Sequence, residues 1–148
     1  MLKSDIITRT EGQDAMQIRE YTEYQQEQIL RLYADVGWTA YTDEPEVLKK
    51  SFENSLLTLA AYDGAALLGL IRVVGDGYSV VFVQDLLVRP EYQRKGVGSA
   101  LLRAVLDRYA DVRQIELAAD DTLETQAFYR SVGFRELSEI GCCGFMKL

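Results

Sequence analysis

The spacing of apolar residues changes several times along the chain, and each spacing predicts a different element. Alternating apolar residues predict strands, whereas apolar residues three and four positions apart predict helices that bury one face. We expect strands at 17–21, 56–62, 66–74, 79–88 and 115–119, helices at 22–36, 45–54, 96–109 and 122–132, and two short strands near Glu136 and Phe145. The predicted order is β-α-α-β-β-β-α-β-α-β-β.

Turn and boundary residues sharpen this outline. Thr22 followed by Gln25 is a capping-box start for the first helix, and Asp63-Gly64 predicts a hairpin turn. The run 79–88 is almost continuously apolar, which is typical of a strand buried on both faces. Residues 1–14 lack periodicity and are predicted to be a flexible N-terminal extension, whereas 15–148 form a single α/β domain with a mixed sheet.

Composition excludes several kinds of site. The 148 residues include no histidine, which removes Ser-His-Asp and Cys-His catalysis and the commonest metal ligand. The two cysteines, Cys142 and Cys143, are adjacent and lack the spacing of a zinc or redox site, so we expect reduced thiols packed in a late strand. The sequence therefore predicts no metal site.

The net charge of the chain limits which classes of binding partner are expected. A net charge of −7 argues against nucleic acid or an anionic membrane as a partner and favours small cations. No apolar run is long enough to span a membrane, and the first residues contain no hydrophobic signal core. We expect a cytoplasmic enzyme or binding domain, with a homodimer as one option for its assembly.

The segment 83–102 carries the clearest chemical signal. A buried strand runs into a glycine-containing turn, where unpaired N–H groups and the positive end of a helix dipole favour binding of a diphosphate. Arg89, Arg94 and Lys95 add positive charge. The turn lacks the Gly-Lys-Ser/Thr of a P-loop, and Leu101 stands where a dinucleotide fingerprint needs a small residue. An anionic cofactor is indicated.

Two motifs identify a family resemblance. Gln93-x-x-Gly96-x-Gly98, preceded by Leu86-x-Val88-x-Pro90, resembles the acetyl-CoA motif of the GCN5-related N-acetyltransferases (GNAT). Ala127-Phe128-Tyr129-x-x-Val132-Gly133-Phe134 resembles a later motif of the same family. The resemblance implies that residues 15–148 are an acetyltransferase domain with a GNAT-like sheet, a splayed central strand pair and acetyl-CoA as cosubstrate.

The resemblance also implies the cofactor contacts. Pantetheine would bond to the backbone of the strand at 86–88, where a backbone N–H would donate to the thioester oxygen, and the pyrophosphate would lie on the N–H groups of 94–99. Thr122 stands where many members have Asn. The predicted cofactor-binding residues are Leu86, Leu87, Val88, Gln93, Arg94, Lys95, Gly96, Val97, Gly98, Ser99, Thr122 and Phe128.

Tyr129 resembles the family's general acid by position. A phenol with a pKa of about 10 stays protonated at neutral pH and can give its proton to a leaving thiolate. The other interpretation is an aromatic residue that only packs, and Phe128, roughly 100° away around the helix, is better suited to packing.

Asp85 is the second predicted catalytic residue. It interrupts an apolar strand, and burying a carboxylate without partners is costly, so a role is expected. It could accept a proton through water, attract a cationic acceptor, or only tie down a neighbouring loop. Asp120 and Asp121 are weaker candidates for the base.

The acceptor pocket is predicted at the loop between the first two helices. In the family this loop usually lines one side of the acceptor pocket. Here it contains Trp38 and Tyr41, followed by Asp43-Glu44. An aromatic wall beside carboxylates suits an amine cation with an apolar body, although Trp38 could simply plug the helices onto the sheet. Arg72 and Asp76 are predicted to line the same cleft, or else to be ordinary exposed charges.

The predicted function is an acetyl-CoA-dependent N-acetyltransferase that acts by direct attack in a ternary complex, because no activated nucleophile is visible. The expected acceptor is a small primary amine, aromatic or alkyl. A protein or peptide N-acetyltransferase and a non-catalytic CoA-binding sensor or interaction module are the alternatives.

Overall fold

The computed structural model describes residues 7, 8 and 16–148. Most of the predicted N-terminal extension, residues 1–14, therefore lies outside the described residues. The chain divides into two units, one ending at Leu117 and the other spanning Ala118–Leu148. The two units are described in turn.

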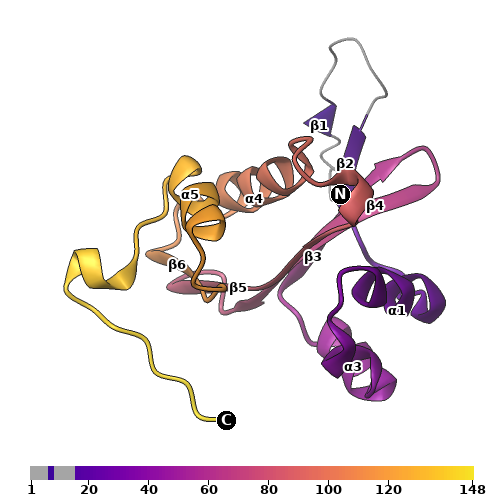
Figure 1. Cartoon of the computed structure of the whole chain (residues 1–148), viewed down its shortest axis with the longest axis horizontal. Helices are drawn as coiled ribbons and strands as arrows, with labels where there is room; N and C mark the ends of the chain where they lie inside the picture. The colour runs from indigo at the N-terminus through magenta and orange to yellow at the C-terminus, as the bar shows by residue number, and fades with distance from the viewer. Residues whose placement is uncertain (1–6, 9–15) are drawn as a thin grey trace. The chain divides into compact units, whose positions relative to one another are not determined.

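The first unit contains a six-stranded sheet whose strands follow the order of the chain (Figure 1). Its strands are β1 (Ile7–Thr8), β2 (Met16–Glu20), β3 (Leu57–Asp63), β4 (Ala66–Gly75), β5 (Val80–Val88) and β6 (Gln114–Leu117). Neighbouring strands are antiparallel except for β5 and β6, which are parallel. This confirms the predicted α/β fold class with a mixed sheet.

Helices cover both faces of the sheet (Figure 1). They are α1 (Gln26–Asp35), α2 (Thr39–Thr42), α3 (Pro45–Glu53) and α4 (Val97–Arg108), with a 3-10 turn η1 at Pro90–Tyr92. On the α1 and α3 face, Ile29, Leu32 and Leu48 are buried against Leu70 and Leu87 of the sheet. Each such side chain contributes roughly 1.5–3 kcal/mol by burial, so this apolar layer fixes the helices over β4 and β5.

The end of β5 is held close to β4 by a glycine. A Cβ atom at Gly69 would lie against the backbone carbonyl of Leu87, so no larger residue fits there without a shift. On its other side, β5 pairs with β6 only at Val80–Val83. Within the described residues, the second half of β5 therefore has no strand partner on that side, which is the divergence expected of a splayed pair.

The second unit contains α5 (Leu123–Ser131) and a 3-10 turn η2 (Leu137–Ile140). The prediction of short strands near Glu136 and Phe145 is wrong. The 3-10 turn η2 follows Glu136, and Phe145 lies in an irregular part of the chain. A strand needs a partner for its backbone groups, and neither segment pairs with another strand in the described residues. Cys142 and Cys143 are exposed free thiols rather than packed strand residues.

The start of the first helix also differs from its prediction. α1 begins at Gln26, and Gln25 precedes it without a side-chain cap, so Thr22 is not the capping residue. The Tyr21 hydroxyl instead accepts the Gln25 N–H at 3.2 Å. The short helix α2 was not predicted. Among the described residues, no helix combines the length and apolarity needed to cross a membrane.

Candidate active site

A bulge in β5 directs two successive side chains toward the same residue, Tyr41. Val73 pairs with Val83 but Arg72 pairs with Asp85, so β5 contains one residue more than β4 at this point. The extra residue is Gln84. Bulges redirect side chains, and here Gln84 and Asp85 both bond to Tyr41 of α2.

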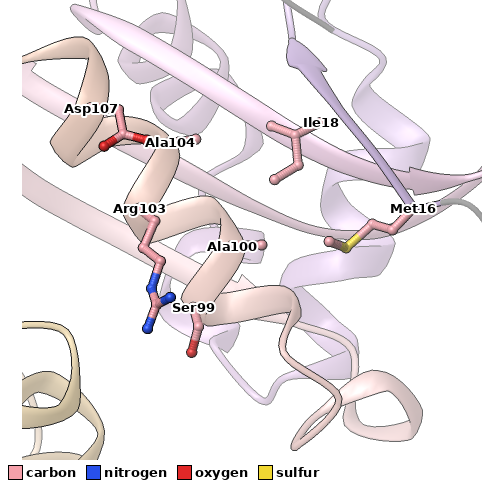
Figure 2. A pocket seen from close by; sticks show the side chains of 7 residues that line it. All are labelled: Met16, Ile18, Ser99, Ala100, Arg103, Ala104 and Asp107. Carbon is pink, nitrogen blue, oxygen red and sulfur yellow. The ribbon is translucent and has the colours of Figure 1, made fainter. Parts of the chain in front are cut away.

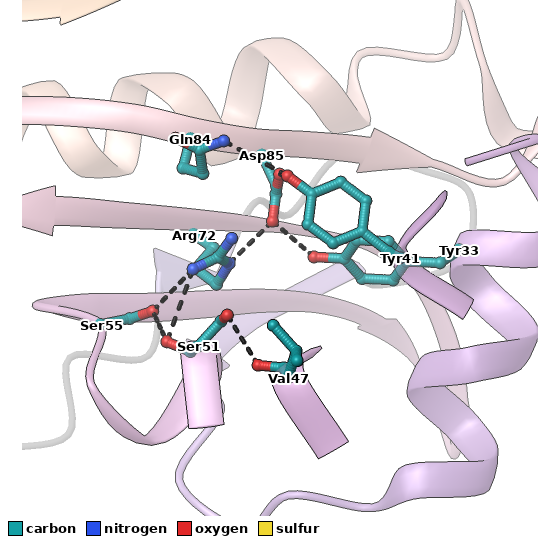
Figure 3. Close-up of polar contacts among 8 residues, drawn as sticks. All are labelled: Tyr33, Tyr41, Val47, Ser51, Ser55, Arg72, Gln84 and Asp85. Carbon is teal, nitrogen blue, oxygen red and sulfur yellow. Dashed lines mark hydrogen bonds and ion pairs between the residues drawn. The ribbon is translucent and has the colours of Figure 1, made fainter. Parts of the chain in front are cut away.

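Asp85 is the centre of a buried polar network, drawn in Figure 3. Its carboxylate is 1% exposed. One oxygen, Oδ2, accepts hydrogen bonds from Arg72 Nε at 2.7 Å and from the Tyr33 hydroxyl at 2.6 Å. The other, Oδ1, accepts the Tyr41 hydroxyl at 3.0 Å. Both oxygens are therefore satisfied by side chains from three other elements, as a buried carboxylate requires.

Arg72 balances the charge of Asp85. Its guanidinium is buried and also donates from Nη1 to the Ser55 hydroxyl at 3.1 Å, while its Cζ lies 5.5 Å from the centre of the Phe52 ring. Burial by itself lowers the pKa of Arg72, but the neighbouring Asp85 carboxylate outweighs burial and the net pKa is raised. The raised pKa keeps Arg72 charged at neutral pH, and its burial shows that it is not the exposed charge that was one of its two interpretations.

The two tyrosines of the network differ in exposure. Tyr33 is completely buried, and burial, reinforced by the charge of Asp85, raises the pKa of its hydroxyl well above the ordinary value. Tyr41 is half-buried, and burial again raises its pKa although the hydrogen bond from Gln84 opposes this. Both phenols therefore remain protonated and donate to Asp85. Trp38 stacks on Tyr41 with a centroid distance of 6.0 Å.

A cavity of about 220 Å³ lies beside this network, between α2 and α3. Its lining residues are Ala40, Tyr41, Glu44, Val47, Leu48 and Ser51. Tyr41 and Ser51 line the cavity and also contact the network. The Tyr41 hydroxyl donates to Asp85, and the Ser51 carbonyl accepts a contact from Arg72 at 3.5 Å. The cavity combines an aromatic wall, aliphatic side chains and one carboxylate, which suits a small cation with an apolar body.

The turn before α4 is built from backbone. Gly96 precedes the helix with a φ of 85°, a left-handed conformation, and a Cβ atom there would meet nothing within 4 Å. The first intrahelical bond from this end is donated by Ala100 to the Gly96 carbonyl. The N–H groups of Val97, Gly98 and Ser99 have no acceptor within the helix, so they are available to an anion.

Two observations show that the predicted cofactor residues of β5 and of the turn before α4 are compatible with a CoA-like group. The open space beside Gly96 lets a diphosphate approach the N–H groups of the turn. The second half of β5, including Leu86, Leu87 and Val88, has a backbone edge that no strand covers in the described residues. Gln93 supports this edge, because its Nε2 donates to the Val88 carbonyl at 3.0 Å.

A second cavity, of about 110 Å³, lies between α4 and β2 in the same unit (Figure 2). Its lining residues are Met16, Ile18, Ser99, Ala100, Arg103, Ala104 and Asp107. Of the predicted cofactor residues it contains Ser99 alone. It therefore adds no further contact to the predicted cofactor site.

In the second unit, Tyr129 lies in an aromatic cluster on α5. Its ring centre is 5.0 Å from that of Phe128 and 5.9 Å from that of Phe134. Burial raises the pKa of the Tyr129 hydroxyl, which keeps it protonated at neutral pH. Thr122 caps α5, because its Oγ1 accepts the Thr125 N–H at 3.1 Å. The predicted cofactor contacts of Phe128 and Thr122 remain predictions.

Asp76 has a local structural role. Its carboxylate accepts the Ser79 hydroxyl and the N–H groups of Tyr78, Ser79 and Val80, all within its own turn. The structure thus joins Arg72 and Tyr41 to Asp85 and gives Asp76 other partners, and a substrate contact of Asp76 remains a prediction. In the part of the chain that the structure describes, no three His, Cys, Asp or Glu side chains form a group suited to a metal ion.

Tyr33 is, with Gln84, a site residue that sequence reasoning missed. It lies on the buried face of α1, and its hydroxyl also holds Asp85 from 52 positions away. A buried tyrosine usually needs a hydrogen-bond partner, so a tyrosine on a core-facing helix stripe was the available signal.

Comparison with known proteins gives a consistent family assignment. The family model described as an acetyltransferase (GNAT) domain matches residues 20–143. The chain is 39% identical over 72 residues to the chloroplastic GCN5-related N-acetyltransferase 2 of Arabidopsis thaliana, a match covering 46% of this chain and 26% of that protein. An uncharacterized N-acetyltransferase of Gracilaria tenuistipitata var. liui is 26% identical over 110 residues, covering 70% of this chain and 58% of its own length. The matches thus span about a quarter and somewhat over half of these relatives.

Solved structures share the fold. A GNAT-family acetyltransferase from Streptococcus pneumoniae has a TM-score of 0.82 and 42% identity, covering 90% of this chain and 97% of its own. An aminoglycoside N-acetyltransferase in complex with CoA has a TM-score of 0.72 at 16% identity, covering 95% of this chain and 97% of its own. The second similarity, at this low identity, shows the fold alone.

Proposed function

Because the chain belongs to the GNAT family of acetyltransferases, we propose that it is an acetyl-CoA-dependent N-acetyltransferase whose acceptor is a small primary amine. The observation that carries the proposal is the turn before α4, where N–H groups without an acceptor in the helix and a left-handed Gly96 meet the edge of β5 that no described strand covers. That combination suits a ligand with a diphosphate at one end and amide groups at the other, as CoA has.

The chain's own residues would have distinct tasks. Bound acetyl-CoA supplies an acetyl thioester, which the amine converts to an amide with release of a thiol. The N–H groups of Val97, Gly98 and Ser99 would hold the diphosphate, and the backbone of β5 at Leu87 or Val88 would donate to the thioester oxygen. The Tyr129 hydroxyl, kept protonated by burial that raises its pKa, would supply the proton for the departing thiolate.

The acceptor class is supported by the cavity between α2 and α3. Its volume of about 220 Å³ is below the roughly 300–1,000 Å³ of pockets for drug-sized ligands, which favours a small molecule over a folded protein surface. Glu44 supplies a negative charge for an ammonium group, and Tyr41 and Val47 supply apolar contact for its body.

The proposal is tested by incubating the protein with acetyl-CoA and three acceptors: n-butylamine, 2-phenylethylamine and a peptide with free α- and ε-amines. Acetylated products should be measured by mass spectrometry, because the exposed thiols of Cys142 and Cys143 would react with a thiol reagent. We expect acetylation of a small amine, and a 10- to 1000-fold lower turnover in Tyr129→Phe with CoA affinity unchanged.

Two results would contradict the proposal. Binding of CoA without acetylation of any acceptor would indicate a non-catalytic CoA-binding module. Acetylation of the peptide in preference to both small amines would move the acceptor class to proteins or peptides.

A further inference from the structure

Among the described residues, the buried Asp85 can exchange a proton with its surroundings only through a side chain that bonds to it. Its carboxylate is 1% exposed, and the side chains that bond to it are Arg72, Tyr33 and Tyr41. Arg72 is 4% exposed and has no acceptor atom, and Tyr33 is 0% exposed. Tyr41 is partly exposed and lines the cavity between α2 and α3. Of these neighbours, Tyr41 is therefore the one that connects Asp85 with a ligand.

The hydrogen bonds of Tyr41 define what it can offer that ligand. A phenol has one proton to donate and two lone pairs that accept. The proton of Tyr41 goes to Asp85 Oδ1 at 3.0 Å, and one lone pair accepts Gln84 Nε2 at 3.2 Å (Figure 3). One acceptor position is left, so Tyr41 is suited to receive an N–H group.

We infer that Tyr41 binds the acceptor amine through its hydroxyl oxygen and passes the amine's proton to Asp85; the inference rests on the proposed acetyltransferase function. The amine attacks as its free base, after its ammonium form has released one proton to solvent. As the carbon–nitrogen bond of the amide forms and the carbon–sulfur bond of the thioester breaks, one nitrogen–hydrogen bond also breaks and its proton moves to the Tyr41 oxygen. The proton already on Tyr41 moves to Asp85 Oδ1. Tyr41 ends as it began, Asp85 becomes a neutral carboxylic acid, and no electrons are exchanged with another reagent.

The surrounding charges are compatible with this transfer. The groups that face Asp85 are Arg72 from β4, Tyr33 from α1 and Tyr41 from α2, and Glu44 lines the same cavity as Tyr41. The Arg72 guanidinium, paired with Asp85, balances the charge of the carboxylate that receives the proton. A nitrogen loses its proton readily once it bonds to an acyl carbon, so a carboxylate can serve as the final acceptor.

The decisive experiment compares Tyr41→Phe with Tyr33→Phe. Each change removes one hydroxyl that bonds to Asp85, but only Tyr41 lines the cavity. Binding of 2-phenylethylamine to the protein without CoA is measured by calorimetry. Tyr41→Phe should weaken this binding about tenfold or more, the size of one hydrogen bond from a charged donor, whereas Tyr33→Phe should leave it within twofold.

Turnover provides the second readout. Tyr41→Phe should lower kcat 10- to 100-fold with CoA affinity retained, and Tyr33→Phe should lower it less. The wild-type rate should fall in D2O because a proton moves through Tyr41 during turnover. Tyr41→Phe should lose this solvent isotope effect, and Tyr33→Phe should keep it.

Each remaining outcome overturns the inference in a recognisable way. Equal losses in the two variants would mean that both hydroxyls merely stabilise Asp85, and unchanged kcat in Tyr41→Phe would mean that the proton leaves by another route. In both cases the proposed function would stand. If the wild-type protein acetylates no amine, the proposed function fails, and this inference fails with it.

Discussion

The turn before α4 and the network around Asp85 lie in the same unit but are built from different parts of the chain. The turn uses backbone N–H groups and the freedom of Gly96, all within a few consecutive residues. The network uses side chains from α1, α2, β4 and β5, separated by between 13 and 52 positions. A backbone site should be sensitive to conformation and indifferent to most side chains, and a side-chain network should behave in the opposite way.

The largest expected effect comes from removing one charge of the network. Asp85→Asn leaves the buried Arg72 guanidinium without its counter-charge, and breaking a buried ion pair in this way costs about 3–5 kcal/mol. We expect that loss in the free energy of unfolding measured with urea. Affinity for CoA, measured by calorimetry on the folded protein, should change little, because the turn before α4 does not depend on Asp85.

Two further variants serve as controls for Asp85→Asn. Glu20→Gln breaks an ion pair with Arg108 in which both side chains are nearly half exposed, and it should cost no more than about 1 kcal/mol. The double variant Arg72→Met, Asp85→Leu removes both charges and should recover much of the lost stability. A loss of stability below about 1 kcal/mol in Asp85→Asn would show that the buried Asp85–Arg72 pair contributes no more to stability than an exposed pair.

The same comparison explains which features the sequence could predict. The turn is contiguous, so the spacing of Gln93, Gly96 and Gly98 identified it directly. The network depends on a bulge in β5 and on the approach of Tyr33 and Tyr41 to Asp85, and neither follows from local pattern. Sequence reasoning found Asp85 as an anomaly in an apolar strand but left its partners open.

Element boundaries follow the same rule. Most helices and strands were predicted within one or two residues because periodic burial fixes them. The start of α1 was misplaced because the Tyr21 hydroxyl, rather than Thr22, satisfies a backbone N–H there. The strands near Glu136 and Phe145 were wrong because alternation alone does not provide a neighbouring strand.

An intermediate effect is expected at the turn itself. Gly96 and Gly64 both have positive φ, at 85° and 56°, and both have open space where a Cβ would be placed. Replacing either by Ala should therefore cost a similar 1–2 kcal/mol or so of backbone strain. Only Gly96→Ala should also weaken CoA binding, at least tenfold, because the new methyl group occupies the space through which the diphosphate approaches. An equal loss of CoA affinity in Gly64→Ala would mean that strain, and not access, decides binding.

The smallest expected effect concerns a carboxylate with local partners. Hydrogen bonds from the Ser79 hydroxyl and from the N–H groups of Tyr78, Val80 and Ser79 hold the pKa of Asp76 well below its usual value. A depressed folded-state pKa contributes stability that is complete above the unfolded pKa of 3.8 and is lost as the pH falls through the folded value.

Asp76→Asn should therefore lower the melting temperature slightly at pH 7 and by less at pH 3. Because Asp76 is exposed, its loss at pH 7 should be far smaller than that of Asp85→Asn, and a comparable loss would show that burial is not what separates the two carboxylates.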